Sequence, residues 1–244
     1  MIRDWSACTA LVTGGRRGLG RAYAEELGRL GVRVRVTSRT PTGPDELRWD
    51  MDDAGSTRAL LDELGDIDLL VHAAHAFAPH VPIVALRAEE LAASLSRNVV
   101  AAYDLLRGVC RRMTRAGFGR VLIVGSLAAT VGGVGQTSYI VEKSALAGMA
   151  RAFSAELAPK GVLVNVVHPA IVDTENVRER VRPELLESYR RRAPGGRLLA
   201  PLDVVHASIG LLDPRQQGVT GQSLAVTGGV DSGAAWLVPD GDEP

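Results

Sequence analysis

Short apolar runs alternate along the chain with longer stretches in which apolar residues recur at helical spacing. The runs predict strands and the stretches predict helices. The clearest helices are Leu19–Leu30, which is followed by Gly31, and Ser138–Leu157, which stops at Pro159. The predicted strands are Ala7–Thr13, Val32–Thr37, Ile67–His72, Arg120–Gly125, Val162–Val167 and Ser223–Val226. This alternation predicts an α/β fold, a doubly wound parallel sheet with helices on both faces.

One crossover of the predicted sheet is unusually short. Only residues 40–49 separate Arg39 from Asp50, and they include Pro41, Gly43 and Pro44. A parallel crossover usually needs a dozen or more residues and a helix. We therefore expect a trimmed loop here, without a full helix.

Composition narrows the class of protein. The 244 residues suffice for one large domain, and the 28 basic and 28 acidic side chains cancel, which argues against a nucleic-acid partner. No apolar run has transmembrane length, and Met1–Trp5 lacks the apolar core of a signal peptide, so we expect no membrane association and a cytoplasmic location. With only Cys8 and Cys110, we expect no disulfide framework.

A glycine-rich turn separates the first predicted strand from the first predicted helix. It reads Thr13-Gly14-Gly15-Arg16-Arg17-Gly18-Leu19-Gly20. Glycines at this place let the backbone approach a pyrophosphate, and the helix N-terminus supplies N–H donors and positive potential. Because a strand precedes it and a helix follows it, the turn predicts a dinucleotide site rather than a plain tight turn.

The second predicted strand ends without the acidic residue that commonly accepts a hydrogen bond from the adenosine ribose of NAD. The chain there reads Thr37-Ser38-Arg39. Ser38 does not repel a 2′-phosphate, and Arg17 and Arg39 could pair with one. We therefore expect NADP(H) as the cofactor; the alternative is that both arginines are only solvated.

Tyr139 and Lys143 lie four residues apart on a predicted helix, so their side chains project from one face. A free tyrosine has a pKa of about 10. A nearby ammonium favours the phenolate and would lower that pKa toward the working range of an acid–base group. Taken alone, the pair favours a surface contact between residues four apart on a helix.

Two further polar residues strengthen the acid–base interpretation. Ser126 ends the strand at Arg120–Gly125, thirteen residues before Tyr139, and Asn98 lies on the preceding long helix. In order and spacing, Asn98, Ser126, Tyr139 and Lys143 resemble the catalytic tetrad of the short-chain dehydrogenase/reductase family.

Other segments carry the same resemblance from about residue 5 to residue 233. The glycine turn resembles the family's TGxxxGxG motif. Asn165–Thr174 resembles its Asn-Val-x-x-Pro-Gly-x-x-x-Thr segment, and Thr220-Gly221-Gln222 with Gly228-Gly229 resembles its C-terminal strand. Within the family the chain is most similar to β-ketoacyl-carrier-protein reductases and secondary-metabolite ketoreductases.

The resemblance implies one Rossmann-type domain over residues 1–244, with a substrate lid at about 172–200. It implies that Tyr139 exchanges a proton with the substrate oxygen, that Ser126 hydrogen-bonds that oxygen, and that Asn98 holds a water of the proton relay. Lys143 would lower the tyrosine pKa and bind the nicotinamide ribose. The cofactor-binding residues expected from the turn and the resemblance are Gly14, Arg16, Arg17, Gly18, Leu19, Gly20, Ser38, Arg39, Asp50, Met51, Ala73, Ala74, His75, Tyr139, Lys143, Pro169, Ala170, Val172 and Thr174.

The chain departs from the family where an Asn-Asn-Ala-Gly motif is expected. It reads His72-Ala73-Ala74-His75, and His80 follows. Three interpretations stay open: structural replacement, an extra acid–base or substrate-contacting group, and a metal site, for which no carboxylate or cysteine joins the cluster. We expect no metal, and we expect His75 to contact the nicotinamide half of the cofactor. The family's Pro-Gly is Pro169-Ala170 here, and we expect a structural role for the preceding His168.

The predicted lid is rich in arginine. These residues form either a solvated helical face or a recognition site for an acidic substrate or a phosphopantetheine-carrying protein. Arg115 and Lys160 fall near positions where fatty-acid reductases present basic residues to carrier proteins. The lid arginines are Arg178, Arg180, Arg182, Arg190, Arg191, Arg192 and Arg197.

The expected function is interconversion of a ketone and a secondary alcohol, with a small carbonyl substrate that is free or tethered to a carrier protein. The alternatives are a cofactor-sensing or scaffold protein without turnover, and a dehydratase or epimerase that uses the same tyrosine. We also expect a homodimer or homotetramer through the helix around Glu89–Arg115 and the helix of Tyr139. The apolar stripe considered for that interface is Leu91, Leu95, Val99, Leu106 and Val109.

Overall fold

A computed structural model describes residues 4–231 and contains one seven-stranded sheet in which every strand pair is parallel. The strand order is β3-β2-β1-β4-β5-β6-β7. The order reverses beside β1, so the chain is doubly wound, as predicted. The strands are β1 (Thr9–Thr13), β2 (Arg33–Ser38), β3 (Glu46–Arg48), β4 (Leu69–His72), β5 (Gly119–Val124), β6 (Val162–Pro169) and β7 (Ser223–Val226).

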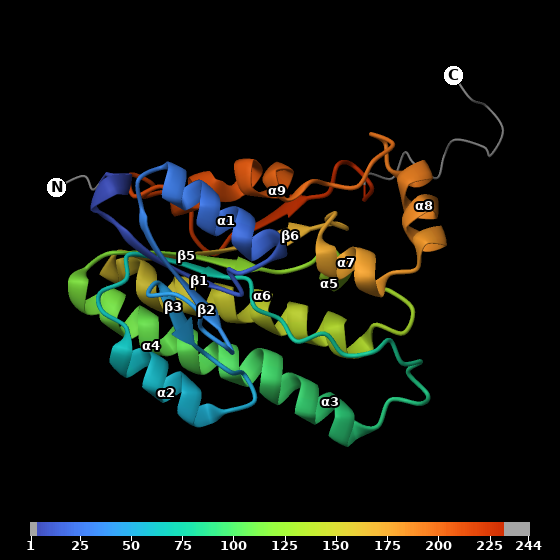
Figure 1. Cartoon of the computed structure of the whole chain (residues 1–244), viewed down its shortest axis with the longest axis horizontal. Coiled ribbons are helices and arrows are strands. Elements are labelled where there is room, and N and C mark those ends of the chain that lie inside the picture. Colours follow the sequence, from blue (N-terminus) through green and yellow to red (C-terminus); the bar gives the residue numbers. More distant parts are fainter. Residues whose placement is uncertain (1–3, 232–244) are drawn as a thin grey trace.

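Helices cover both faces of the sheet (Figure 1). One face packs against α1 (Gly18–Arg29) and α9 (Pro201–Ser208), and the other against α2 (Ala54–Glu63), α4 (Ala101–Ala116) and α6 (Thr137–Leu157). The central strands β5 and β6 are buried along their whole length, which explains their nearly continuous valine, leucine and isoleucine runs. Within the described residues, no helix is long and apolar enough to span a bilayer.

The trimmed crossover is confirmed. Residues 39–45 connect β2 directly to β3 without a helix, and β3 is only Glu46–Arg48. β3 is the outermost strand of the sheet, and it pairs in parallel with the last residues of β2, Val36–Ser38.

The long predicted helix is interrupted. It consists of α3 (Ala88–Leu95), a π-helical segment at Ser96–Val100 and α4. The expectation that Leu106 and Val109 belong to an intersubunit stripe is wrong, because both are fully buried in the chain's own core. Helical periodicity in the sequence identifies an apolar face, but it does not show whether that face packs into the chain's own core or against another subunit.

One buried polar residue, Asn165, fastens the C-terminal strands. The Asn165 side chain donates to Val219 O (2.9 Å) and accepts from Gln222 N (3.0 Å), which pins the segment before β7 to β6. Cys8 and Cys110 are both buried and are not joined in a disulfide, as predicted.

Candidate active site

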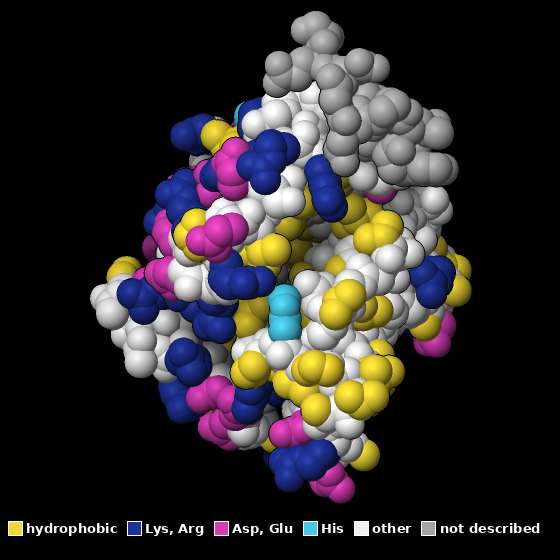
Figure 2. Space-filling view, turned by 90° about the vertical axis from the view of Figure 1, so that its right-hand side faces the viewer, with side chains coloured by type: hydrophobic (Ala, Val, Ile, Leu, Met, Phe, Trp, Pro, Cys, Tyr) yellow, Lys and Arg dark blue, Asp and Glu magenta, His cyan; other side chains and the backbone are white. Residues whose placement is uncertain are grey.

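A cavity of about 1380 Å³ opens at the carboxyl ends of the strands. The glycine turn and the ends of β2 and β3 line one half, and β5, α6 and the segment after β6 line the other. Figure 2 shows a hollow lined by hydrophobic side chains, with Lys and Arg side chains gathered along one border. Ligands of doubly wound sheets bind at this edge of the sheet.

The glycine turn is built for close backbone approach. Gly14 adopts a φ of +67°, and a Cβ at Gly20 would collide with the carbonyl oxygen of Gly14. Leu19 and the predicted turn residues around it line the cavity. The fit to a dinucleotide rests on the tightness of this turn, since a Cβ at Gly20 would strike the backbone of Gly14, and on the N-terminus of α1 that faces the cavity.

Arg16, Arg17, Ser38 and Arg39 all line the adenosine end of the cavity. We expected Arg17 and Arg39 to recognise a phosphate, yet it is Arg16 that contacts the end of β2. Its Nη1 donates to Ser38 Oγ (3.1 Å) and to Thr40 O (2.8 Å). This guanidinium therefore lies beside the place where Ser38 leaves room for a 2′-phosphate. Asp50 and Met51 line the same end, as predicted.

Thr13 fixes the loop after β4 against the glycine turn. Its Oγ1 accepts from Ala73 N and Ala74 N (both 3.1 Å) and lies 3.0 Å from His72 Nδ1. Burial lowers the pKa of His72 to about 3, so the ring is neutral. His72 thus braces β1 against β4, which supports structural replacement at this position.

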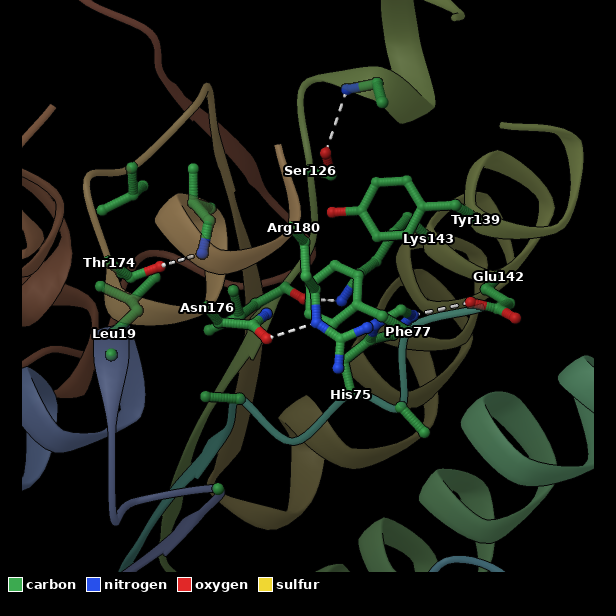
Figure 3. A pocket seen from close by; sticks show the side chains of 18 of the residues that line it. Leu19, His75, Phe77, Ser126, Tyr139, Glu142, Lys143, Thr174, Asn176 and Arg180 are labelled. Atoms are coloured by element: carbon green, nitrogen blue, oxygen red, sulfur yellow. Dashed lines mark hydrogen bonds and ion pairs between the residues drawn. The ribbon is translucent and has the colours of Figure 1, made fainter. Parts of the chain in front are cut away.

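Ser126 and Tyr139 face one another across the substrate half of the cavity. The Tyr139 hydroxyl points toward Ser126, which follows β5 (Figure 3). Burial raises the pKa of Tyr139, the Ser126 hydroxyl lowers it, and the carboxylate of Glu142 raises it again. The net direction is upward, against our expectation of a lowered pKa.

Lys143 is buried beneath Tyr139. Its Nζ donates to Val124 O at 3.0 Å and lies 5.8 Å from the centre of the Tyr139 ring. Burial lowers the pKa of Lys143 to about 8, and Glu142 opposes that shift. The ammonium is thus held between the end of β5 and the tyrosine.

Asn98 lies in the π-helical segment, as functional residues often do. It is buried; its Oδ1 accepts from Ala76 N (2.8 Å) and its Nδ2 donates to Ala76 O (3.0 Å). Its amide therefore fixes the loop that carries His75. The water of the expected proton relay stays a prediction.

His168 supports Ser126 from behind. Its Nδ1 lies 2.9 Å from Ser126 O, and its Nε2 lies 3.3 Å from Ser223 Oγ. Burial lowers its pKa, so the ring is neutral, and its Nδ1 either donates to Ser126 O or accepts from Ser126 N (3.2 Å), depending on the tautomer. This agrees with the structural role expected for His168.

His75 points to α6 and contacts Glu142, a partner that the sequence analysis did not predict. Its Nε2 lies 2.7 Å from Glu142 Oε2, and both side chains are almost fully buried. The His75 ring also packs edge-on against Tyr139 and Phe77, with ring centres 5.2 and 4.6 Å apart. The only sequence signal was the unusual histidine at position 75, because Glu142 lies 67 residues away.

The three histidines after β4 do not converge. His72 bonds Thr13 and His75 bonds Glu142, while His80 lies exposed in the loop beyond them. Among residues 4–231, no group of three or more His, Cys, Asp or Glu side chains is arranged to hold a metal ion.

The predicted lid is closed at its base by a bridge between Val172 and Leu199. It contains α7 (Glu175–Arg180) and α8 (Pro183–Arg192), and Thr174 caps α7 by accepting from Val177 N. The predicted residues that line the cavity here are Pro169, Ala170, Val172 and Thr174.

Six of the seven lid arginines, all but Arg182, divide into two groups. Arg178 forms a two-pronged pair with Asp173, and Arg190, Arg191 and Arg197 pair with Glu187 or Asp203. Arg180 and Arg192 instead line the cavity, and no ion pair to either is found within residues 4–231.

Comparison with known proteins agrees with this geometry. Residues 14–231 match the family model described as Enoyl-(Acyl carrier protein) reductase. The 3-oxoacyl-[acyl-carrier-protein] reductase FabG of Haemophilus influenzae is 31% identical over 236 residues, which cover 91% of this chain and 97% of the relative.

Two solved structures superpose closely. A putative NAD(P)-dependent gluconate 5-dehydrogenase from Beutenbergia cavernae, with NADP bound at low occupancy, has a TM-score of 0.85 and 30% identity, covering 93% of this chain and 98% of its own. A 3-oxoacyl (acyl-carrier-protein) reductase from Agrobacterium tumefaciens with NADP bound has a TM-score of 0.84 and 28% identity, covering 93% and 95%. The chain therefore belongs to the short-chain dehydrogenase/reductase family, and it is an NAD(P)-dependent oxidoreductase by that membership.

Proposed function

We propose that this protein interconverts a ketone and a secondary alcohol with NADP(H), and that reduction is the favoured direction. The observation that carries the proposal is the arrangement of Ser126, Tyr139 and Lys143 in one cavity with the glycine turn. Tyr139 and Ser126 supply two hydroxyls on one side of the substrate half, and Lys143 supplies a buried ammonium beneath them.

Each side chain has a distinct task. When bound, NADPH supplies the hydride to the carbonyl carbon. Ser126 donates a hydrogen bond to the carbonyl oxygen, and Tyr139 donates the proton that this oxygen takes up. Because burial raises the pKa of Tyr139, its hydroxyl stays protonated at neutral pH, which suits a proton donor. Lys143 stabilises the phenolate that remains.

Preference for NADP(H) over NAD(H) is supported by the arginines at the end of β2. Arg16 contacts Ser38, Arg17 and Arg39 line the same end of the cavity, and no acidic side chain occupies position 38. Guanidinium groups bind phosphate through paired, charge-assisted hydrogen bonds. The NADP found in the two related structures supports the same assignment.

The substrate is either free or tethered to a carrier protein, as in the FabG relatives. Arg115 and Lys160, the basic residues considered for carrier binding, precede the N-terminal ends of β5 and β6. They therefore lie at the edge of the sheet opposite Ser126, and they do not line the cavity.

A second candidate is a free keto or hydroxy acid, favoured by Arg180 and Arg192. Arg180 lies with its guanidinium 5.5 Å from the Phe77 ring centre, and Phe77 stacks on Tyr139 with ring centres 6.0 Å apart. Its Nε donates to Asn176 Oδ1 at 2.7 Å, which leaves the outer nitrogens toward the cavity. A carboxylate on the substrate would find its counter-charge here.

A panel of ketones, quinones, β-ketoacyl thioesters and keto acids, followed by NADPH oxidation, tests the proposed function. Reduction of at least one class supports it; cofactor binding without turnover of any member would favour the sensing or scaffold alternative.

A β-keto acid and its methyl ester test the second candidate. Arg180→Gln should raise KM for the acid about tenfold and leave the ester unchanged, since an exposed charge-assisted contact contributes about 1.4 kcal/mol.

The matched control is Arg178→Gln on the same helix, because Arg178 is paired with Asp173 and does not line the cavity. Equal KM values for acid and ester in the wild type would remove the acidic-substrate candidate.

A further inference from the structure

Glu142 is a buried carboxylate in the middle of the acid–base group. It lies on α6 between Tyr139 and Lys143 and its side chain is only 1% exposed. A carboxylate that is taken out of water without partners costs several kcal/mol, and such a group usually becomes protonated instead. Glu142 can therefore stay charged only if neighbouring groups stabilise its carboxylate.

Three side chains hold the charged form of Glu142. His75 Nε2 lies 2.7 Å from Oε2, Ser94 donates its hydroxyl to Oε1, and the Asn98 side chain also contributes a hydrogen bond. Together these contacts outweigh burial and hold the pKa of Glu142 below its usual value. Glu142 is thus ionised at neutral pH.

The partner histidine does not cancel that charge. Burial and the nearby Lys143 ammonium lower the pKa of His75 to about 4, so its ring is neutral. A carboxylate only accepts, so Nε2 carries the proton and donates it, and Nδ1 is left as a buried nitrogen without a hydrogen-bond partner among the described residues. The negative charge of Glu142 therefore acts on its other neighbours.

Lys143 is the cation on which this charge acts: it follows Glu142 directly on α6, and the carboxylate favours its charged form. The titratable groups around Lys143 are Tyr139 and Glu142 on α6, His72 at the end of β4, His75 in the following loop and His168 on β6. The three histidines are neutral, because burial lowers each pKa. Glu142 is the one group among these that carries a negative charge at neutral pH.

We propose that Glu142 is a positioning residue that holds the positive charge on buried Lys143 and the proton on Tyr139, and that His75 and Ser94 keep Glu142 in place. The inference rests on the proposed function only for the roles of Tyr139 and Lys143 in turnover. It also explains why His75 stands where the family has glycine: its ring reaches across to α6 and donates to the carboxylate.

The sign of the effect is the same for both groups. The Glu142 carboxylate raises the pKa of Lys143 and the pKa of Tyr139. Removing it lowers both, so the ammonium and the phenol lose their protons at lower pH. The alkaline limb of kcat for reduction, which requires both protons, must then move to lower pH.

Glu142→Gln tests this, because the amide keeps the shape and removes the charge. We expect the alkaline limb of its pH–kcat profile to move down by about one pH unit, the lower end of what one close charge does. Glu142→Asp, which keeps the charge, should restore most of the wild-type profile. Glu156→Gln, on an exposed position of α6, is the matched control and should leave the profile unchanged.

A second readout does not depend on turnover. The ultraviolet absorbance of tyrosinate, taken as the difference between each protein and its Tyr139→Phe counterpart, reports the titration of Tyr139 alone. We expect Tyr139 to ionise at lower pH in Glu142→Gln than in the wild type. If no carbonyl compound is reduced, the proposed function fails while this titration still decides the role of Glu142.

An unchanged or higher midpoint for Tyr139, together with an unmoved alkaline limb, would overturn the proposal and leave Glu142 a purely structural residue. Thermal unfolding and NADPH binding establish that each variant is folded. Should the glutamine variant not fold, Glu142→Met with Ser94→Ala removes the charge together with one of the donors that it would leave unpaired, and the same two readouts apply.

Discussion

Changing Ser38 to Asp should reverse the cofactor preference. Ser38 is half-buried at the end of β2, and the Arg16 guanidinium already donates to its hydroxyl at 3.1 Å. A carboxylate at this position would pair with Arg16, withdraw that guanidinium from the cofactor, and repel a 2′-phosphate. It would also accept a hydrogen bond from the free ribose hydroxyl of NADH.

The magnitude follows from the exposure of the site. Two unit charges about 4 Å apart interact by about 1 kcal/mol in water and about 4 kcal/mol near a protein surface. The Arg16 side chain is 42% exposed and also lies 3.6 Å from Glu46, so solvent and a carboxylate both weaken its hold on phosphate. We therefore expect a wild-type preference for NADPH of at least about tenfold, or 1.4 kcal/mol, and a loss of about ten- to hundredfold in NADPH affinity for Ser38→Asp.

Fluorescence titration of both cofactors into both proteins measures this directly. Ser38→Ala is the matched control, because it removes the hydroxyl without adding charge and should keep the preference for NADPH. Equal or tighter binding of NADH by the wild type would show that the arginines at this end of the cavity do not recognise the phosphate, and the reasoning would fail.

Three further outcomes are expected. Gly20→Ala should abolish measurable NADPH binding with circular dichroism unchanged, because the added Cβ collides with Gly14 O; binding within twofold of the wild type would contradict the role of the turn. His75→Gly should change the cofactor affinity in the same titrations or the range of substrates reduced. It should also lower the free energy of unfolding by about 1–3 kcal/mol, since buried Glu142 loses a donor. A structure with bound cofactor in which His75 is turned away from the nicotinamide half would contradict the expected contact. The protein should be a homodimer or homotetramer by light scattering, and Tyr103→Asp, at a 42% exposed position on α4, should lower its mass; a monomeric wild type at micromolar concentration would refute this.

Local patterns were sufficient to predict the fold. The strands that end up in the middle of the sheet are nearly continuous apolar runs, so their ranges agree with the structure to within a few residues. The three-residue strand β3 was not among the predicted strands, because a strand this short at the sheet edge has no clear period.

The cavity residues were predictable because each follows a strand or shares a helix face with another. Tyr139 and Lys143 lie on one face of α6, and Ser126 follows β5, so topology alone brings them to one edge of the sheet. The contact between His75 and Glu142 is different, because it depends on how the loop after β4 approaches α6. That approach is set by the tertiary contacts of Asn98 and Thr13, which no local pattern encodes.

The contact between Arg16 and Ser38 was not predictable from the sequence for a related reason, and the phosphate contacts of Arg17 and Arg39 stay a prediction. Arg16 and Arg17 are neighbours in a tight turn, so the backbone dihedrals of the turn decide which side chain reaches Ser38. Sequence spacing shows that a cation is near the end of β2, but it does not show which one.

The central claim is that Tyr139 transfers a proton during NADPH-dependent reduction of a carbonyl compound. Its most direct test is kcat of Tyr139→Phe with the best carbonyl substrate, measured beside its NADPH affinity. The account predicts a fall of about 10²–10⁴-fold in kcat, the usual contribution of a positioned general acid, with NADPH still bound and the fold intact. Turnover close to that of the wild type would contradict it.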